Sequence, residues 1–173
     1  MTSNFFKEYN FEFQGYPDYQ DVLPELERII QTKAKGAFPL ILALNEAVCN
    51  AAKYSTSGPL NAKIFINLKI ICHNIIITIS AKTIKFNALN YQKKLQKIAS
   101  DKTAANKTWT DYVGIEPVSR GFWLMLSAVD YLIIKDDGNK VKLVFNTRSN
   151  IKQSKKVGDL VQKFIVEKDG VYL

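Results

Sequence analysis

The segment from Leu42 to Tyr54 constrains this chain most, because it predicts a helix with two separate lines of side chains. Its apolar stripe recurs at helical spacing and consists of Ile41, Leu44, Val48 and Ala51. This stripe predicts packing against a core. The same helix carries a line of polar side chains that a simple surface helix would not need.

The polar line contains Glu46 and Asn50, whose i,i+4 spacing puts them on the same side of the helix one turn apart. Lys53 falls close to the same line. Glu46 can accept a proton, and the amide oxygen of Asn50 can bind a hard cation. Mg²⁺ prefers oxygen ligands and retains several waters, so Asn50 and nucleotide phosphates could complete its coordination shell. The alternative interpretation is a solvated face rich in Asn and Glu.

Length and composition favour a single domain. The chain has 173 residues, 47% of them apolar, which is enough for one substantial core. The stretch Met1–Tyr9 lacks the apolar run of a signal peptide, and the longest apolar stretch, 64–79, is interrupted by polar residues. We therefore expect a cytoplasmic protein that has no membrane-spanning segment.

The cysteines and the histidine give little support to metal or triad chemistry. Cys49 and Cys72 are expected to be reduced, buried, small hydrophobic residues. They lack the spacing of a metal site, and His73 is the only histidine. Zinc chemistry and a Ser-His-Asp triad are therefore poorly supported.

The formal net charge of +8 at pH 7 is compatible with nucleic acid, an acidic protein partner or an anionic nucleotide. The lysines are scattered rather than gathered on one helix, which favours a solvated surface. Nucleic-acid binding is disfavoured because the sequence has no interleaved aromatic and basic residues of the kind that form a stacking platform.

Apolar spacing and turn formers predict the elements of the first half. They are a strand at 9–14, a turn at 15–18, a helix at 21–35 that Asp21 caps and Gly36 ends, the helix opened by Phe38-Pro39, and a hairpin formed by 61–71 and 75–80. Phe11 and Phe13 share one face of the first strand, which predicts an edge or half-buried strand.

The second half begins with an unusual interval, 84–119, that has little apolar content. It contains a predicted helix at 89–100 and a polar stretch at 101–110, and either a functional loop or a disordered excursion would fit. The remaining predictions are a helix at 121–129, strands at 131–134 and 140–145 joined through Asp137-Gly138, a linker at 148–156 and an amphipathic helix at 157–166.

The apolar stripe of the last helix needs a surface to cover it, on its own sheet or on a second subunit. Together the elements predict an α+β fold, a two-layer sandwich in which helices cover one face of a mixed sheet.

Three segments resemble the histidine-kinase-like (GHKL) ATPase superfamily. Asn45-Glu46-Ala47, followed by Asn50-Ala51, is similar to the N box of these ATPases. Ser119-Arg120-Gly121 and the helix after it resemble a glycine-rich segment of the anti-sigma-factor serine kinase branch. The hairpin at 131–145 is similar to the closing hairpin of that branch. Order and spacing agree from about Asn10 to Phe145.

The resemblance implies a mixed, mostly antiparallel sheet and an ATPase-like domain at 1–147, with a mobile ATP lid at 84–119. Residues 148–173 would then be a linker and a helical extension. Glu46 would act as catalytic base, and Asn50 would bind Mg²⁺. Lys53, Arg120 and Gly121 would contact the nucleotide, whose phosphates a helix N-terminus at Gly121 attracts.

The chain departs from the family where the nucleotide base would bind. Ala81-Lys82-Thr83 stands where active relatives have an Asp-x-Gly segment. Ala81 cannot accept the hydrogen bond of the adenine amino group, and Thr83 adds bulk at the glycine position. Losing one buried polar partner costs about 1–3 kcal/mol, or roughly a five- to 150-fold loss in affinity. Ser119 also replaces the first glycine of the phosphate segment.

The resemblance, taken with these departures, implies a cytoplasmic, anti-sigma-factor-like regulator. Its partner would be a protein such as a sigma factor or an antagonist, its cofactors ATP and Mg²⁺, and it could carry serine/threonine kinase activity. A homodimer is expected because kinase relatives commonly pair. Two alternatives stay open: a nucleotide-independent interaction domain on the same fold, and a basic nucleic-acid binder.

Overall fold

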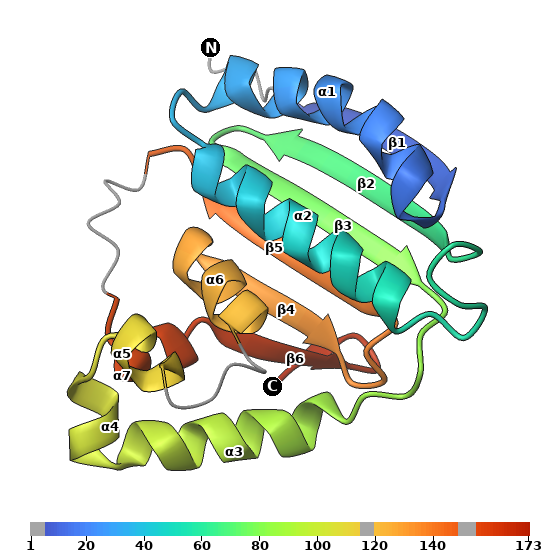
Figure 1. The fold of residues 1–173 in the computed structure, drawn as a ribbon. Helices are drawn as coiled ribbons and strands as arrows, with labels where there is room; N and C mark the ends of the chain where they lie inside the picture. The colour runs from blue at the N-terminus through green and yellow to red at the C-terminus, as the bar shows by residue number, and fades with distance from the viewer. Residues whose placement is uncertain (1–5, 115–119, 149–154) are drawn as a thin grey trace.

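A mixed sheet with helices packed against it forms the framework of the protein (Figure 1). The structure is a computed structural model, and it describes residues 6–114, 120–148 and 155–173. The strands are β1 (Phe6–Gln14), β2 (Lys63–Ile71), β3 (Asn74–Ala81), β4 (Tyr131–Lys135), β5 (Lys140–Asn146), β6 (Phe164–Lys168) and β7 (Val171–Tyr172). The helices are α1 (Gly15–Lys33), α2 (Phe38–Lys53), α3 (Ala88–Ser100), α4 (Lys102–Asn106), α5 (Trp109–Val113), α6 (Arg120–Ala128) and α7 (Val157–Val161).

The strand order is β1-β2-β3-β5-β4-β6-β7. Every neighbouring pair is antiparallel except β4 and β6, which are parallel. The predicted α+β class with a mixed, mostly antiparallel sheet is therefore confirmed. β1 lies at one edge of the sheet, as its sequence predicted, with Phe13 buried and Phe11 half-buried.

One face of the sheet is buried under helices. In β2 and β3 every second side chain is buried, and the residues between them are exposed or half-buried. Pairs such as Ile66 with Ile79 and Leu68 with Ile77 sit directly opposite each other on the buried face. α1, α2 and α6 lie across this face (Figure 1). The core therefore lies between the central strands and α2.

The predicted helix that carries Glu46 and Asn50 is α2. Pro39 lies in its first turn, where a missing N–H is tolerated. Ile41, Leu44 and Val48 of the predicted stripe are almost completely buried, and so is Leu40. Ala51, the fourth residue of the stripe, is half-buried and lines a cavity. The first three stripe residues thus pack into the core as predicted, which fixes the direction in which the polar line can point.

The first helix begins earlier than predicted. α1 starts at Gly15, so the predicted turn at 15–18 and the Asp21 cap are wrong. Gly15 has φ +69°, and a Cβ there would lie 2.7 Å from the carbonyl oxygen of Leu60. The Asp18 carboxylate accepts a hydrogen bond of 3.2 Å from the N–H of Gln14. The residues that predicted a turn instead form the first turn of the helix, because Pro17 and Asp18 are also favourable at a helix N-terminus.

Three helices, α3, α4 and α5, occupy most of the described part of the interval 84–119, so a disordered excursion does not describe residues 84–114. α3 agrees with the helix predicted at 89–100. The ambiguous polar stretch forms two short helices with side-chain caps: Asp101 accepts from the N–H groups of Thr103 and Ala104, and Thr108 accepts from that of Asp111. Residues 115–119 lie outside the described part, and the mobility of this interval stays a prediction.

The predicted amphipathic helix at 157–166 is wrong. The segment forms the short helix α7 and then the strand β6, which pairs in parallel with β4 so that Phe164 lies opposite Leu132. Over so few residues the apolar positions fit a helical period and a strand period equally, and the free edge of β4 decides between them. Val157, Leu160, Phe164 and Val166 are buried within this chain, so their burial does not need a second subunit.

The C-terminal segment 155–173 also holds α3, α4 and α5 in place. The N–H of Trp109 donates to the carbonyl of Lys155 over 2.8 Å, and that of Val157 donates to Lys107 over 3.0 Å. The side chain of Gln92 donates to the carbonyl of Leu173 over 2.9 Å. The helices after β3 are therefore bound by hydrogen bonds to a segment far away in the sequence. Lys155 belongs to the predicted linker at 148–156, so the described part of this linker packs against the domain through its hydrogen bond with Trp109.

Neither described cysteine is in a disulfide. Cys49 is half-buried on α2, and Cys72 is exposed, so the expectation of burial is wrong for Cys72. Cys72 lies in the tight turn between β2 and β3 with φ +53°, which turns it away from the core. None of the helices in the described ranges has the length and apolar character needed to cross a membrane.

Candidate functional site

A cavity of about 780 Å³ lies beside α2. The inner face of the sheet contributes Ile79, Ile134 and Val141 to its lining, and α2 contributes the small side chains of Ala47 and Ala51. Residues of α3 and α6 and of the segment after β3 complete the walls. The cavity therefore joins parts of the chain that are far apart in sequence.

Glu46 and Asn50 both line this cavity, as their spacing on one face of α2 predicted. Each is half-buried, while Leu44 and Val48 on the other side of the helix are fully buried. Asn45, the neighbouring residue of the motif, faces elsewhere, because its side-chain oxygen accepts a hydrogen bond of 2.6 Å from the hydroxyl of Tyr19. The motif thus divides into a structural asparagine and two cavity residues.

The carboxylate of Glu46 lies against Gly121 in the first turn of α6. A Cβ at position 121 would collide with the Glu46 carboxylate, so glycine makes this approach possible. The N-terminal end of a helix carries a partial positive charge that favours a nearby carboxylate. A phosphate bound at the same helix end would meet the negative charge of Glu46, and a divalent cation between them would offset that repulsion. We call Glu46, Asn50 and Gly121 the α6 end of the cavity.

Arg120 does not line the cavity. It is the first residue of α6 and is exposed, so of the two predicted phosphate residues only Gly121 lines the cavity. Ser119 lies outside the described residues. Of the residues singled out from sequence, the cavity brings together Glu46, Asn50, Lys53, Ala81, Thr83 and Gly121.

Three lysines line the cavity from different sides: Lys53 of α2, Lys85 after β3 and Lys94 of α3. Glu46 is the one acidic side chain among the described lining residues, so positive charge predominates there. The Lys53 ammonium lies 5.2 Å from the centre of the Tyr54 ring. Sequence reasoning found Lys53 and missed the other two, although Tyr91, Lys94 and Ile98 follow one another at helical spacing. A cavity with this charge favours an anionic ligand.

Aromatic side chains from several elements form part of the cavity wall. Tyr91 packs edge-on against Phe122 with a centroid distance of 5.0 Å, and Phe122 packs edge-on against the buried Phe164 at 5.2 Å. Tyr54, exposed over 44% of its surface, also lines the cavity. Sequence reasoning missed these residues. Flat apolar surfaces next to lysines suit a ligand with a planar ring and an anionic group.

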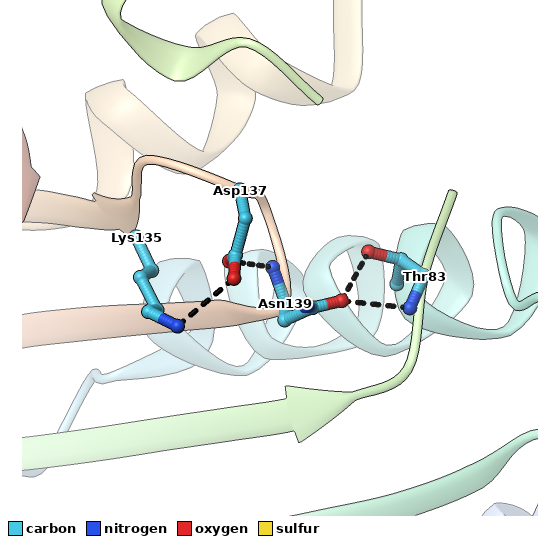
Figure 2. A network of polar contacts seen from close by, with 4 residues as sticks. All are labelled: Thr83, Lys135, Asp137 and Asn139. Atoms are coloured by element: carbon cyan, nitrogen blue, oxygen red, sulfur yellow. Dashed lines mark hydrogen bonds and ion pairs between the residues drawn. The ribbon is translucent and has the colours of Figure 1, made fainter. Parts of the chain in front are cut away.

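The opposite end of the cavity lies where β3 ends, and it contains Ala81, Thr83 and Asn139, which we call the β3 end. The N–H of Thr83 donates to Oδ1 of Asn139 over 2.9 Å, and the Thr83 hydroxyl donates to the same oxygen over 3.1 Å (Figure 2). The side chain of Thr83 thus hydrogen-bonds to Asn139. Asn139 was not predicted as a site residue from the sequence.

Asp137 fixes the turn that carries Asn139. Its carboxylate accepts a hydrogen bond of 3.0 Å from the N–H of Asn139 and one of 2.9 Å from the Lys135 ammonium (Figure 2). Burial alone would raise the pKa of Asp137, but the hydrogen bonds from Lys135 and Asn139 outweigh it and lower this pKa below its ordinary value. The carboxylate therefore stays ionised and holds the turn.

A second cluster, outside the cavity, contains Tyr16, Tyr19 and Cys49. Burial raises the pKa of all three groups. The Cys49 thiol therefore stays protonated at neutral pH and is a weak nucleophile.

Metal binding at the α6 end would depend on the ligand. Within the described ranges, His, Cys, Asp and Glu side chains form no group of three or more that could hold an ion. Asn50, with Glu46 beside it, would supply at most a minority of an octahedral Mg²⁺ shell, and phosphate oxygens and water would supply the rest. This donor set fits a cation that arrives with a nucleotide.

Comparison of the chain with protein-family models and with curated proteins found no match.

Proposed function

We propose that this chain is a nucleotide-binding regulatory domain of the histidine-kinase-like ATPase type. The observation that supports this most is the convergence of Glu46, Asn50 and Gly121 on one end of a lysine-lined cavity whose remaining walls are apolar and aromatic. A nucleotide has an anionic chain and a flat ring, and both find complementary surfaces here. ATP with Mg²⁺ is the proposed ligand.

The proposed binding is weak. Ala81 offers no side-chain acceptor to an adenine amino group, and the side chain at Thr83 occupies space where a glycine would leave room. The proposed Mg²⁺ dependence is strong, because the cation must offset the charge of Glu46 next to the phosphates.

Titration calorimetry with ATP and ADP, each with and without Mg²⁺, tests this proposal. We expect ATP to bind with Mg²⁺ and to bind much more weakly without it. Asn50→Ala should reduce the Mg²⁺-dependent part. Asn90→Ala is the matched control, because Asn90 is exposed on α3 and does not line the cavity. Absence of ATP binding at millimolar concentration, in a protein with the expected circular dichroism, would refute the proposal.

We propose further that the domain acts on a protein partner, as an anti-sigma-factor-like regulator, with serine phosphorylation as its chemistry. Glu46 would orient or deprotonate the hydroxyl of a substrate serine, and Mg²⁺ on Asn50 would offset charge on the transferred phosphoryl group. The half-buried position of Glu46 beside the N-terminal end of α6 supports this role. The class of partner rests on the sequence resemblance.

The second candidate is a regulator that has kept the fold and lost catalysis. The interlocked Thr83 and Asn139 favour it, because the polar groups of the β3 end already satisfy one another in part. Phosphoryl transfer from labelled ATP to a serine-bearing partner separates the two candidates: the kinase transfers phosphate, and the pseudo-ATPase binds the partner without transfer.

A further inference from the structure

The wall of the cavity that α3 forms is supported by the C-terminal end of the chain. Tyr91, Lys94, Leu95 and Ile98 of α3 line the cavity. The elements against which α3 packs most extensively are α4, α7 and β6, and α4 in turn packs against α7 (Figure 1). Both α7 and β6 belong to residues 155–173, which we call the strap. The helix that closes one side of the cavity therefore has its main support in the strap.

Hydrogen bonds connect the strap to both ends of the region from α3 to α5. Near the start of α3, the side-chain amide of Gln92 donates to the carbonyl of Leu173 over 2.9 Å and to that of Phe164 over 3.4 Å. After α4, the main-chain bonds made by the N–H groups of Trp109 and Val157 connect the two segments. The strap thus holds this region at two separate places.

Phe164 of the strap lies behind the aromatic side chains of the cavity wall. Its ring packs edge-on against Phe122 at 5.2 Å and against Tyr91 at 6.3 Å, and it is 4% exposed. Tyr91 and Phe122 line the cavity, whereas Phe164 is not among the described lining residues. Phe164 therefore sets the position of two rings that face the cavity without facing it itself.

The strap is bound more firmly to the sheet than to α3. The N–H of Leu132 donates to the carbonyl of Lys163 over 3.0 Å, and that of Asp136 donates to Glu167 over 2.9 Å. Within the described ranges, α3 itself makes no main-chain hydrogen bond to the strap, and Gln92 supplies its hydrogen bonds there. Local opening occurs where few hydrogen bonds must break. The contact between α3 and the strap is therefore the one that opens first.

We infer that residues 155–173 hold α3 over the cavity, and that separation of α3 from this strap is the motion by which a ligand enters and leaves. This inference rests on the proposed nucleotide binding for the identity of the ligand. The sequence resemblance to the GHKL ATPases ends at about Phe145, so the strap lies outside it. Gln92 and Phe164 are positioning residues, because they act on the ligand through the wall that they hold.

Hydrogen exchange of the full chain without a ligand tests the hold of the strap on α3. Gln92→Ala removes both side-chain bonds to the strap, and Gln96→Ala makes the same change at an exposed position of α3 that does not line the cavity. We expect the amides of α3 to exchange roughly three- to tenfold faster in Gln92→Ala than in Gln96→Ala. Exchange in β2 and β3 should be the same in both variants. Equal exchange of α3 in the two variants would overturn the inference.

The kinetics of nucleotide exchange test whether this motion controls access. The probe is methylanthraniloyl-ATP with Mg²⁺, which is displaced by excess ATP in a stopped-flow experiment. An opening step that precedes both entry and exit affects both rates, so Gln92→Ala should raise the association and dissociation rate constants by a similar factor and leave Kd nearly unchanged. Faster dissociation with unchanged association would mean that Gln92 only shapes the bound site, and the inference would be wrong. If the wild type binds no nucleotide, the proposed function fails, and the hydrogen-exchange result alone decides whether the strap holds α3.

Discussion

The two ends of the cavity use their polar side chains differently. At the α6 end, no hydrogen bond within the described ranges engages the side chains of Glu46 and Asn50. At the β3 end, Thr83 donates twice to Asn139, and Asp137 holds the turn from which Asn139 projects. The polar side chains of the α6 end are therefore open to an external ligand, and those of the β3 end already bind one another within the chain.

This difference leads to a general expectation. Side chains that make no internal hydrogen bond can be changed with less effect on folding than side chains that do. Groups in an interlocked turn contribute to the fold itself, and their replacement lowers the free energy of unfolding. Variants at the α6 end should alter ligand chemistry, and variants at the β3 end should alter stability.

The largest expected effect is on phosphoryl transfer in Glu46→Gln. This replacement keeps the shape of the side chain and removes the basic carboxylate, so transfer to a serine substrate should fall by about 100-fold or more. The free energy of unfolding should fall by no more than about 0.3–1 kcal/mol, because only the interaction of the carboxylate with the N-terminus of α6 is lost. Radiolabel transfer and calorimetry measure the two quantities, and unchanged transfer would exclude Glu46 as the base.

The second-largest expected effect is a loss of stability at the β3 end in the variant Gly138→Ala. Gly138 has φ +81°, and an added Cβ would lie 2.6 Å from Cβ of Phe86. We expect a loss of about 1–3 kcal/mol in the free energy of unfolding, measured by urea denaturation.

Gly170→Ala is the control for this prediction. Its φ of +80° is nearly the same, but an added Cβ would have no neighbour within 4 Å. The difference between the two variants isolates the contact with Phe86. Equal losses would mean that the close approach of Phe86 to the turn has no energetic consequence.

A smaller effect concerns the charge of the cavity. Lys94→Glu reverses a charge that lines it, whereas Lys97→Glu reverses an exposed charge on the same helix away from it. We expect Lys94→Glu to weaken the affinity for Mg·ATP several-fold more than Lys97→Glu, with the difference shrinking as salt is added. Equal effects of the two variants would show that Lys94 acts only through the overall charge of the protein.

The smallest predicted effect is the pH dependence contributed by Asp137. Its pKa is lower in the folded protein than in the unfolded chain, so its stabilising contribution is present above the unfolded pKa of about 4 and is lost as pH falls through the folded value. Asp137→Asn should therefore be less stable than the wild type at pH 7, and the two should converge at low pH. A stability difference that grew on acidification would contradict the assigned hydrogen bonds.

Local sequence signals predicted most of the fold and one end of the site. The alternation in β2 and β3, the stripe on α2 and the Asp137-Gly138 turn are properties of short segments, and the structure has them where they were expected. The spacing of Glu46 and Asn50 sufficed to place both on the cavity side of α2. These signals need no knowledge of distant contacts.

The remaining features depend on contacts between segments far apart in sequence. Thr83 and Asn139 are 56 positions apart, so no local pattern could reveal their hydrogen bond. The strand β6 forms because β4 offers it a free edge, and its residues alone fit a helix equally well. At the start of α1, the same residues that favour a turn also favour a first helical turn, and the chain takes the second option.

An experimental structure of the protein with Mg²⁺ and a non-hydrolysable ATP analogue tests the central claim most directly. It should show the phosphates and the ion at the α6 end, between Asn50 and the N-terminus of α6, and the purine ring at the β3 end beside Ala81 and Asn139. A ring bound between Glu46 and Gly121, or an analogue bound outside the cavity at saturating concentration, would contradict the assignment of the two ends.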